Sequence, residues 1–361
     1  MTLPDDGATA AARQRMAAGV TAGHPSEWAD AFASVPRHPF VPCFYEQDRA
    51  GAWQGIASGD PGFLEAVYSD TALTIQLDDQ GVPNSSSSQP STMLTMLDAL
   101  DVRDGHRVLE LGTGTGYNTA LLCHRLGDKN VTSVDIDPGL VETATRRLQH
   151  AGFNPTIVVG DGAQGYPGSA PYDRIISTVR LHAIPRPLLE QAAPGAVIVV
   201  PLGYGVIRVT MTGRGHATGR FLPTPALFMA LRTGGAEPQF DAAAQQGPTT
   251  TSVPPADVLG RLKFAASVAL PGLTSCSWRS EQGEVDAVGL WTPDGSTAVA
   301  HGSGAVRQIG PQRLWDTVEK LAKEFTDEPA RDAFLVTITP TRQIVYYEDT
   351  DGPSWPLPTG H

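Results

Sequence analysis

Cysteine is scarce in this sequence, because only Cys43, Cys123 and Cys276 occur in 361 residues, and they lie far apart. An odd number of cysteines without a Cys-x-x-Cys spacing predicts neither a disulfide framework nor a zinc site. The nine histidines are scattered and show no metal-ligand spacing either. We therefore predict three reduced thiols and no bound metal.

Long apolar runs and an excess of positive charge are also absent. No stretch reaches the ~18 uninterrupted apolar residues of a membrane helix, and the N-terminus begins acidic and lacks the apolar core of a secretion signal. The 26 Lys and Arg residues are outnumbered by 38 Asp and Glu residues, so the net charge is -12. Such a charge repels the phosphate backbone of nucleic acids. We predict a cytoplasmic protein without a nucleic-acid or membrane partner.

What is present is the composition of a folded globular protein, with 41% hydrophobic and 18% charged residues. From Arg107 onward, short apolar runs alternate with helical patterns. Runs that are apolar on both faces and interleaved with helices are typical of a parallel sheet covered on both sides, which predicts an α/β fold. The expected strands are RVLELG (107–112), NVTSVDID (130–137), PTIVVGDG (155–162), YDRIISTV (172–179) and AVIVVPLG (196–203), with helices expected over 117–127 and 139–152.

The flanking regions have a different texture. Residues 1–80 combine alanine-rich helical runs with extended crossings, and we assign them to an N-terminal segment that packs on a core of residues 81–235. Residues 236–256 are rich in Gly, Pro, Gln and Thr, which predicts a linker. Residues 257–361 predict a small α+β C-terminal domain. Its expected elements are hairpins over 287–301 and 334–347 and an amphipathic helix over 311–325.

A glycine-rich stretch, LELGTGTGYNTA (109–120), places Gly112, Gly114 and Gly116 between an expected strand and an expected helix. Glycines there let the backbone turn sharply and approach a ligand closely. Tyr117 occupies the sixth position of a G-x-G-x-x-G fingerprint, so the spacing fails for NAD. A P-loop is also excluded, because no Gly-Lys-Ser/Thr follows.

The loop resembles motif I of the S-adenosylmethionine-dependent methyltransferases with a Rossmann-like sheet. Asp135 ends the next expected strand, where it would accept both ribose hydroxyls, and Asp161-Gly162 follows the third strand at the adenine position. Any one of these residues is also explained as a turn glycine or an N-cap aspartate, but their order at three strand ends favours the cofactor. The resemblance implies S-adenosyl-L-methionine held by Glu110, Gly112, Thr113, Gly114, Gly116, Asp135, Ile136, Asp161 and Gly162.

Over about residues 10–232 the chain is similar to the protein-L-isoaspartate O-methyltransferase family. The segments that carry the similarity are SVPRHPFVP (34–42), YSDTALTI (68–75), SSSQP (86–90), VLELGTGTGYNTALL (108–122), GDGAQGYPGSAPYDRIIST (160–178) and IPRPLLEQAAPGAVIVVPLG (184–203). The resemblance implies a class I methyltransferase fold with an N-terminal helical segment. The small C-terminal α+β domain, residues 257–361, is an addition that the common repair enzymes lack.

Four consecutive serines within NSSSSQPSTM (84–93) would by default be a polar linker. The family resemblance instead places them in the pocket where the substrate carboxylate meets the methyl group. It implies catalytic roles for Ser88 and Ser86 and substrate binding by Ser87, which replaces a usually apolar residue. Arg180 and His182 lie near the expected mouth of this pocket, where a core or surface role is an equal alternative to substrate contact.

The whole chain also resembles the actinobacterial branch labelled FxLD-system methyltransferases, through its serine pocket, its C-terminal domain and GSGAVRQIGPQRLWDTVEK (302–320). This resemblance implies that the partner is a modified, macrocyclic precursor peptide (lanthipeptide, lasso peptide or graspetide). Esterification of its aspartate would lead to aspartimide or isoaspartate. The alternative is repair of L-isoaspartate or D-aspartate in damaged proteins. The C-terminal domain would bind the peptide or serve only stability or oligomerisation, and the sequence leaves the oligomeric state open.

Overall fold

The computed structural model describes residues 7–22, 26–48, 50–231 and 236–359. It divides the chain into two compact units that interleave along the sequence, whereas the sequence predicts boundaries after residues 80, 235 and 256. The first unit is Met1–Arg180, Pro185–Val200 and Arg208–Ala217, and the second is Leu181–Ile184, Pro201–Ile207 and Thr218–His361. Strands with residues in both units are β9 (Ala192–Leu202), β10 (Gly205–Gly213) and β11 (His216–Phe221).

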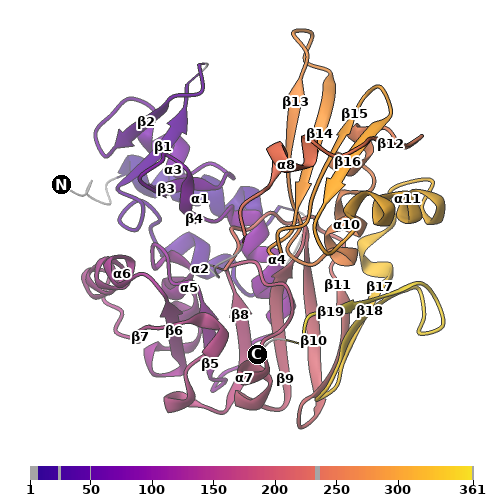
Figure 1. Cartoon of the computed structure of the whole chain (residues 1–361). Helices are drawn as coiled ribbons and strands as arrows, with labels where there is room; N and C mark the ends of the chain where they lie inside the picture. Colours follow the sequence, from indigo (N-terminus) through magenta and orange to yellow (C-terminus); the bar gives the residue numbers. More distant parts are fainter. Residues whose placement is uncertain (1–6, 23–25, 49, 232–235, 360–361) are drawn as a thin grey trace. The chain divides into compact units, whose positions relative to one another are not determined.

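The N-terminal part of the first unit combines short helices with a small antiparallel sheet (Figure 1). The helices are α1 (Gly7–Val20), α2 (Ala29–Ser34) and α3 (Phe63–Val67). The sheet has the order β2-β1-β3-β4, with β1 (Cys43–Gln47), β2 (Trp53–Ala57), β3 (Leu73–Leu77) and β4 (Pro83–Ser87). The helices α1 and α2 agree with the sequence prediction. The sheet was not predicted, because its strands are short and carry no continuous apolar run.

The core of the first unit is the predicted parallel sheet, whose strand order is β10-β9-β8-β5-β6-β7. Strands β5 to β9 pair in parallel. All four residues of β5 are buried, as expected for a strand covered on both faces. The remaining bounds are β5 (Val108–Leu111), β6 (Val131–Asp135), β7 (Thr156–Val159), β8 (Tyr172–Ser177), α4 (Pro90–Leu100), α5 (Tyr117–Leu126), α6 (Pro138–His150) and α7 (Arg186–Gln191).

Helix α6 shows how local sequence sets these elements. Asp137 caps its N-terminus by accepting hydrogen bonds from two backbone N–H groups, and Gly152, with a φ of +86°, follows its C-terminus. The helix buries Val141, Ala144 and Leu148. These residues are three or four positions apart, which places their side chains on one face of the helix.

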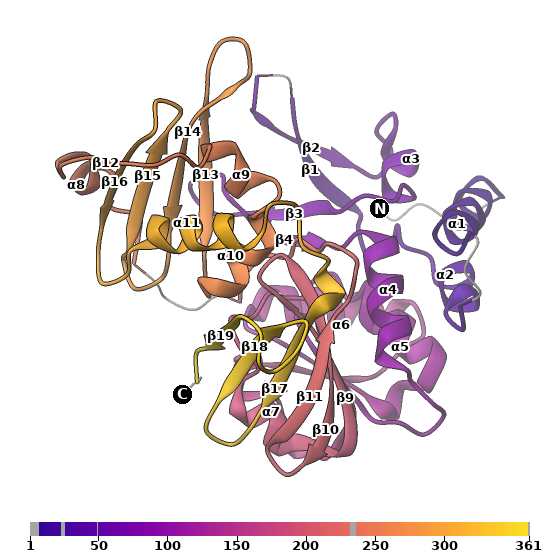
Figure 2. The same ribbon diagram turned by 90° about the vertical axis from the view of Figure 1, so that its right-hand side faces the viewer.

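The second unit contains an antiparallel five-stranded sheet in the order β12-β16-β15-β14-β13, and α11 packs on β15 and β16 (Figure 2). The two predicted hairpins, β14–β15 and β17–β18, are confirmed, as is the predicted helix, which buries Leu314, Val318 and Leu321. A second group of strands has the order β19-β18-β17-β11.

The bounds of these elements are β12 (Thr249–Thr250), β13 (Thr274–Arg279), β14 (Val285–Trp291), β15 (Thr297–His301), β16 (Ala305–Ile309), β17 (Phe334–Ile338), β18 (Gln343–Tyr347), β19 (Ser354–Leu357), α8 (Phe240–Ala244), α9 (Pro255–Leu259), α10 (Lys263–Ala269) and α11 (Leu314–Glu324). Short 3-10 helices are η1 (Asp128–Asn130), η2 (Gly162–Gln164), η3 (Pro167–Ser169) and η4 (Arg331–Ala333).

The segment predicted as a linker, residues 236–256, carries the helix α8 and the strand β12. Its anchor is Phe240, whose ring makes edge contacts with Trp278 and Trp291 at centroid distances of 5.4 and 5.7 Å. The pairing of β12 with β16 holds the other end of this stretch, whose polar composition predicts no structure.

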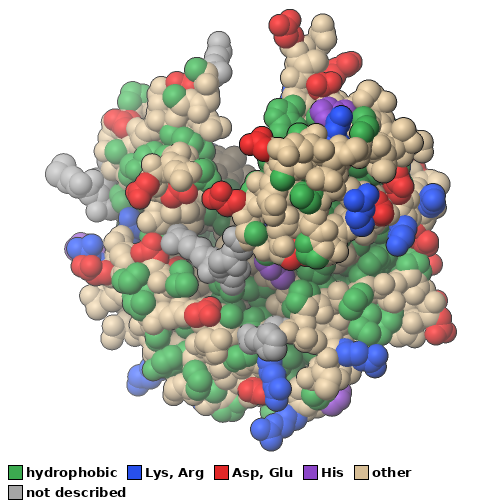
Figure 3. Space-filling view, in the orientation of Figure 1, with side chains coloured by type: hydrophobic (Ala, Val, Ile, Leu, Met, Phe, Trp, Pro, Cys, Tyr) green, Lys and Arg blue, Asp and Glu red, His purple; other side chains and the backbone are tan. Residues whose placement is uncertain are grey.

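The described residues contain neither a helix that could span a membrane nor a cluster of metal ligands. Among them, no helix has the length and apolar character that crossing a bilayer requires. The same residues hold no group of three or more His, Cys, Asp or Glu side chains placed to bind a metal ion. On the face drawn in Figure 3, acidic, basic and hydrophobic side chains are interspersed.

Candidate active site

The glycine loop joins the carboxyl end of β5 to the N-terminus of α5, and its three glycines all have positive φ angles, +88° at Gly112, +51° at Gly114 and +86° at Gly116. Such left-handed backbone favours glycine. A Cβ at Gly112 would lie 2.6 Å from Thr178 Oγ1, and one at Gly116 would lie 3.3 Å from the Cβ of Ala144. Packing inside the chain therefore requires the first and third glycines.

Gly114 lies against the serine segment instead. A Cβ at this position would have one neighbour within 4 Å, the backbone oxygen of Ser86 at 3.9 Å. The structure thus brings together two stretches that the sequence assigns to one site, the loop that would hold the cofactor and the serines that would hold the substrate.

Beneath the loop, the carboxylate of Glu110 is completely buried. It accepts hydrogen bonds from Asn118 Nδ2 and Ser133 Oγ, each at 2.7 Å, and from Thr119 Oγ1. Burial raises the pKa of Glu110, and the three donors oppose that rise. Thr113 Oγ1 lies 2.7 Å from Ser133 Oγ, which ties the loop to the same network. Glu110 therefore supports the loop and the start of α5 from below, and its direct contact with a cofactor stays a prediction.

Asp135 ends β6 beside the loop, as predicted. Its Oδ2 accepts from the N–H of Gly114 at 2.9 Å and its Oδ1 from the N–H of Asp137 at 3.1 Å. Each carboxylate oxygen has a second lone pair, so the group can accept two further donors, the number that a ribose diol offers. Ile136, next along the chain, leaves 41% of its surface exposed, which provides an apolar surface for the flat face of a base.

Asp161 and Gly162 leave the same edge of the sheet as Asp135, because the parallel register of β6 and β7 sets Asp135 opposite Val159. Asp161 is exposed, and its Oδ1 caps the helix η2 by accepting from the N–H of Ala163 at 2.9 Å. Its other oxygen, Oδ2, has no protein partner among the described residues and is available to a ligand. The adenine contact predicted for this pair is compatible with the geometry and stays a prediction.

The serine segment follows the alternation of a β-strand. Ser85 and Ser87 are buried, whereas Ser86 and Ser88 are half-buried. Successive side chains of a strand point to opposite faces. Within β4, Ser86 and Ser87 therefore point to opposite faces, and Ser88 follows the end of the strand. The common assignment of Ser86 and Ser88 to the reacting carboxylate stays a prediction.

The face to which Ser87 points is occupied by Arg37, a completely buried residue to which the sequence reasoning gave no role. Its Nη2 donates to Ser87 Oγ at 3.2 Å and to the backbone oxygen of Ser88 at 3.0 Å. Its other acceptors are the backbone oxygens of Ser87, Val67, Ser69 and Thr71. Burial lowers the pKa of Arg37 to about 10, so the group stays protonated at neutral pH.

The hydrogen bond from Arg37 to Ser87 Oγ affects how the role predicted for Ser87 is assessed. Its hydroxyl accepts from Arg37 and keeps its own proton to donate, so substrate binding by Ser87 stays a prediction. A signal for Arg37 was present in SVPRHPFVP (34–42), where one arginine stands in a largely apolar run. A charge in such a run indicates a buried cation with internal partners.

Arg180 and His182 lie on either side of a boundary between the two units. Arg180 is the last residue of a segment of the first unit, whereas His182 belongs to the second unit. Both are half-buried, and His182 Cε1 would lie 3.3 Å from a Cβ at Gly272. Their assignment to substrate binding stays a prediction.

A glycine loop after the first parallel strand, with acidic residues ending the next two strands, defines a class I S-adenosylmethionine-dependent methyltransferase with a Rossmann-like sheet. The open backbone at Gly114, the spare lone pairs of Asp135 and the exposed Ile136 fit the methionine, ribose and adenine parts of this cofactor. When bound, it supplies a methyl group on a positively charged sulfur.

Comparison with known proteins identifies the family. The family model described as protein-L-isoaspartate(D-aspartate) O-methyltransferase (PCMT) matches residues 59–217. The protein-L-isoaspartate O-methyltransferase of Ignicoccus hospitalis is 35% identical over 204 residues, which cover 55% of this chain and 85% of the relative. Protein-L-isoaspartate O-methyltransferase 1 of Archaeoglobus fulgidus is 39% identical over 176 residues, covering 48% and 70%. The chain belongs to the PCMT family and is an S-adenosylmethionine-dependent carboxyl O-methyltransferase.

A solved structure of a protein-L-isoaspartate O-methyltransferase shares the fold over nearly the whole length. It aligns with a TM-score of 0.54 and 19% identity, covering 95% of this chain and 98% of the other. The shared fold therefore extends beyond residue 217, where the match to the family model ends.

Proposed function

We propose that this chain transfers the methyl group of S-adenosylmethionine to the free carboxylate of L-isoaspartyl residues in peptides or proteins. One observation carries the proposal: the serine segment lies against the glycine loop, with the backbone oxygen of Ser86 3.9 Å from the Cβ position of Gly114. A carboxylate held by these serines would lie beside the methyl donor. The names of the two relatives support the choice of an isoaspartyl substrate.

The chemistry needs little machinery from the protein. A carboxylate with a reference pKa near ~4 is already ionised at neutral pH, so no general base is required. What is required is that one carboxylate oxygen stays in line with the bond between sulfur and methyl, which is catalysis by positioning. Hydroxyl donors suit this task, because a cation gripping both oxygens would reduce their nucleophilicity. We assign Ser88 to this role, with Ser86 as a second donor.

The methyl ester has a defined further reaction. The neighbouring backbone nitrogen attacks the ester carbonyl, loses its proton, and releases methanol as the carbon–oxygen bond to the methoxy group breaks. The product is a five-membered succinimide, which water opens to aspartate or isoaspartate. Repeated cycles convert isoaspartate to aspartate, which amounts to repair.

A second candidate function is esterification of an aspartate in a modified, macrocyclic precursor peptide, leading to aspartimide. The observation in its favour is the region beyond residue 217, which the family model does not cover. The fold likeness over 95% of the chain reduces the weight of that observation, because it includes most of this region. We therefore place this function second.

The test is methyl transfer from labelled S-adenosylmethionine to two linear peptides that differ only in one isoaspartyl or aspartyl residue. We expect saturable transfer to the isoaspartyl peptide and none to the aspartyl peptide. Turnover of a macrocyclic aspartyl peptide, with none of the linear isoaspartyl peptide, would replace the first proposal by the second.

The role of Ser88 is tested in the same assay with Ser88→Ala. Loss of one hydrogen bond to a charged group corresponds to about a 10- to 100-fold fall in kcat/KM. The affinity for S-adenosylmethionine, measured by calorimetry, should not change. Ser91→Ala, a matched change just past the segment, should retain full activity. Full activity of Ser88→Ala would refute the assignment.

A further inference from the structure

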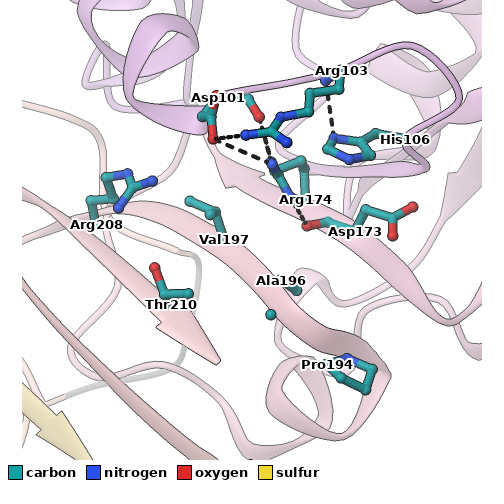
Figure 4. A pocket seen from close by; sticks show the side chains of 11 residues that line it. Asp101, Arg103, His106, Asp173, Arg174, Pro194, Ala196, Val197, Arg208 and Thr210 are labelled. Carbon is teal, nitrogen blue, oxygen red and sulfur yellow. Dashed lines mark hydrogen bonds and ion pairs between the residues drawn. The ribbon is translucent and has the colours of Figure 1, made fainter. Parts of the chain in front are cut away.

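A pocket of about 370 Å³ lies at the end of the parallel sheet opposite to the glycine loop. It is lined by residues that precede β5, by residues in the first halves of β8 and β9, and by Arg208 and Thr210 of β10, whereas the loop follows the carboxyl end of β5. All its lining residues belong to the first unit. Figure 4 shows Arg208 and Thr210 on one side of this pocket and Arg174 and Arg103 on the other.

Arg174 is already satisfied by the protein. Its guanidinium donates to the backbone oxygens of Asp101 and Asp173 at 2.6 to 2.8 Å and lies 3.6 Å from Asp101 Oδ2. The same Asp101 oxygen lies 3.8 Å from Arg103 Nη2. Asp101 is thus shared between two arginines, and Asp173 Oδ2 accepts from the backbone N–H of Arg107 at 2.9 Å.

Arg208, unlike Arg174, uses only one of its guanidinium nitrogens to contact the described part of the protein. Its Nε donates to the backbone oxygen of Ala99 at 2.8 Å, which fixes the orientation of the guanidinium. Its two terminal NH2 groups have no protein partner among the described residues, and the same holds for the hydroxyl of Thr210. A half-buried cation held in place with two free donor groups, beside a free hydroxyl, is an arrangement that matches a planar or tetrahedral oxyanion.

The charges around the pocket also favour an anionic ligand. Three arginines face two aspartates, Asp101 and Asp173, which leaves one positive charge when His106 is neutral. Burial lowers the pKa of His106, and the Arg174 cation lowers it further. His106 Nδ1 accepts from the N–H of Arg103 at 3.0 Å, so the neutral ring carries its proton on Nε2 and offers one more donor. The local excess of positive charge occurs in a chain whose net charge is -12.

We propose that this pocket binds a small oxyanion, a phosphate or a carboxylate, through the guanidinium of Arg208 and the hydroxyl of Thr210. The site is separate from the one that holds the cofactor and the substrate. Asp173 is compatible with an anion here, because its carboxylate points away from Arg208 in Figure 4.

The test uses the full chain and measures its unfolding temperature and, by calorimetry, its affinity for inorganic phosphate and for citrate, with sodium chloride at matched ionic strength as the blank. We expect a saturable rise in unfolding temperature with at least one of the two oxyanions and none with chloride. Binding of phosphate alone would identify the phosphate class, and binding of citrate alone the carboxylate class. No saturable binding of either would overturn the proposal.

Variants locate the bound anion. Arg208→Gln and Thr210→Val should each weaken binding, by about 10- to 100-fold for the arginine, where a charge-assisted contact is lost. Thr210→Val removes a hydroxyl without changing the charge, and it keeps the test valid if Arg208→Gln does not fold. The matched control is Arg146→Gln, an exposed arginine of α6 that is 3.8 Å from Glu142. Equal weakening in the control, or unchanged binding in the folded pocket variants, would overturn the proposal.

Discussion

Arg37→Lys tests the idea that a buried arginine aligns the serine pocket from behind. The substitution keeps the positive charge but replaces a planar fork with a single ammonium group. In the protein, Nη1 donates to the backbone oxygen of Val67 at 3.0 Å, whereas Nη2 donates to that of Ser88 at 3.0 Å. One ammonium nitrogen cannot occupy both nitrogen positions, so the lysine must lose one group of acceptors.

The size of the effect follows from this loss. A hydrogen bond to a charged group contributes about 1.5–3 kcal/mol, and its unpaired buried acceptor adds to the cost. Because lysine recovers part of these contacts, we expect the free energy of unfolding to fall by roughly 3 kcal/mol. Release of the Ser88 backbone would also move the hydroxyl to which we assign the orientation of the substrate. A displacement near 1 Å lowers rates by up to about 100-fold, so we expect kcat to fall by about 10- to 100-fold.

Stability is measured by chemical denaturation and kcat with the isoaspartyl peptide, and affinity for S-adenosylmethionine should stay constant. The matched control is Arg147→Lys, another arginine with a pKa lowered by burial, whose Nη1 donates to the backbone oxygen of Phe40 at 2.8 Å and which does not contact the serines. It should lose stability without loss of kcat. If Arg37→Lys lowers stability while kcat is unchanged, Arg37 is a structural residue and does not align the pocket.

Two further predictions concern the cofactor loop. Gly112→Ala combines a φ of +88° with a Cβ 2.6 Å from Thr178 Oγ1, so we expect a stability loss of roughly 2–5 kcal/mol by thermal or chemical unfolding. Gly127→Ala, with a φ of +79° and no atom within 4 Å of the added Cβ, should lose only the backbone part, and equal losses would refute the clash. Asp135→Asn should raise the Kd for S-adenosylmethionine about tenfold in calorimetry, because an amide presents one acceptor oxygen to the ribose diol instead of two. An unchanged Kd would remove Asp135 from the cofactor site.

The parallel sheet could be predicted because short apolar runs, as in β5 (VLEL), β7 (TIVV) and β9 (AAPGAVIVVPL), alternate with helical patterns along the chain. The small antiparallel sheet β1–β4 could not be predicted from the sequence. Its strand β4, with the sequence PNSSS, has no apolar residue beyond Pro83, and its pairing with β3 depends on contacts that composition does not reveal. The composition of residues 236–256 likewise predicts a linker, because it does not reveal that Phe240 contacts Trp278 and Trp291 and so anchors α8.

The cofactor loop was predictable for a local reason, because positive φ angles call for glycine and the glycines stand next to a strand. The support of the serine pocket was not, because it is non-local. Arg37 collects its acceptors from residues 67–71 and 87–88, which come together only in the folded chain. The sequence marks Arg37 as unusual within an apolar run, but it does not show which carbonyl groups it would meet.

Two features favoured a peptide-tailoring role on sequence grounds. Ser87 stands where the family resemblance implies an apolar residue, and its hydroxyl accepts from Arg37 Nη2 at 3.2 Å. The region beyond residue 217 lies outside the match to the family model, and its likeness to a solved structure shows the fold alone. Isoaspartyl and aspartyl carboxylates are both ionised at neutral pH, so the methyl transfer itself does not distinguish them. The selection between them must come from how the protein holds the backbone on either side of the carboxylate, and only turnover of matched peptides reports on that.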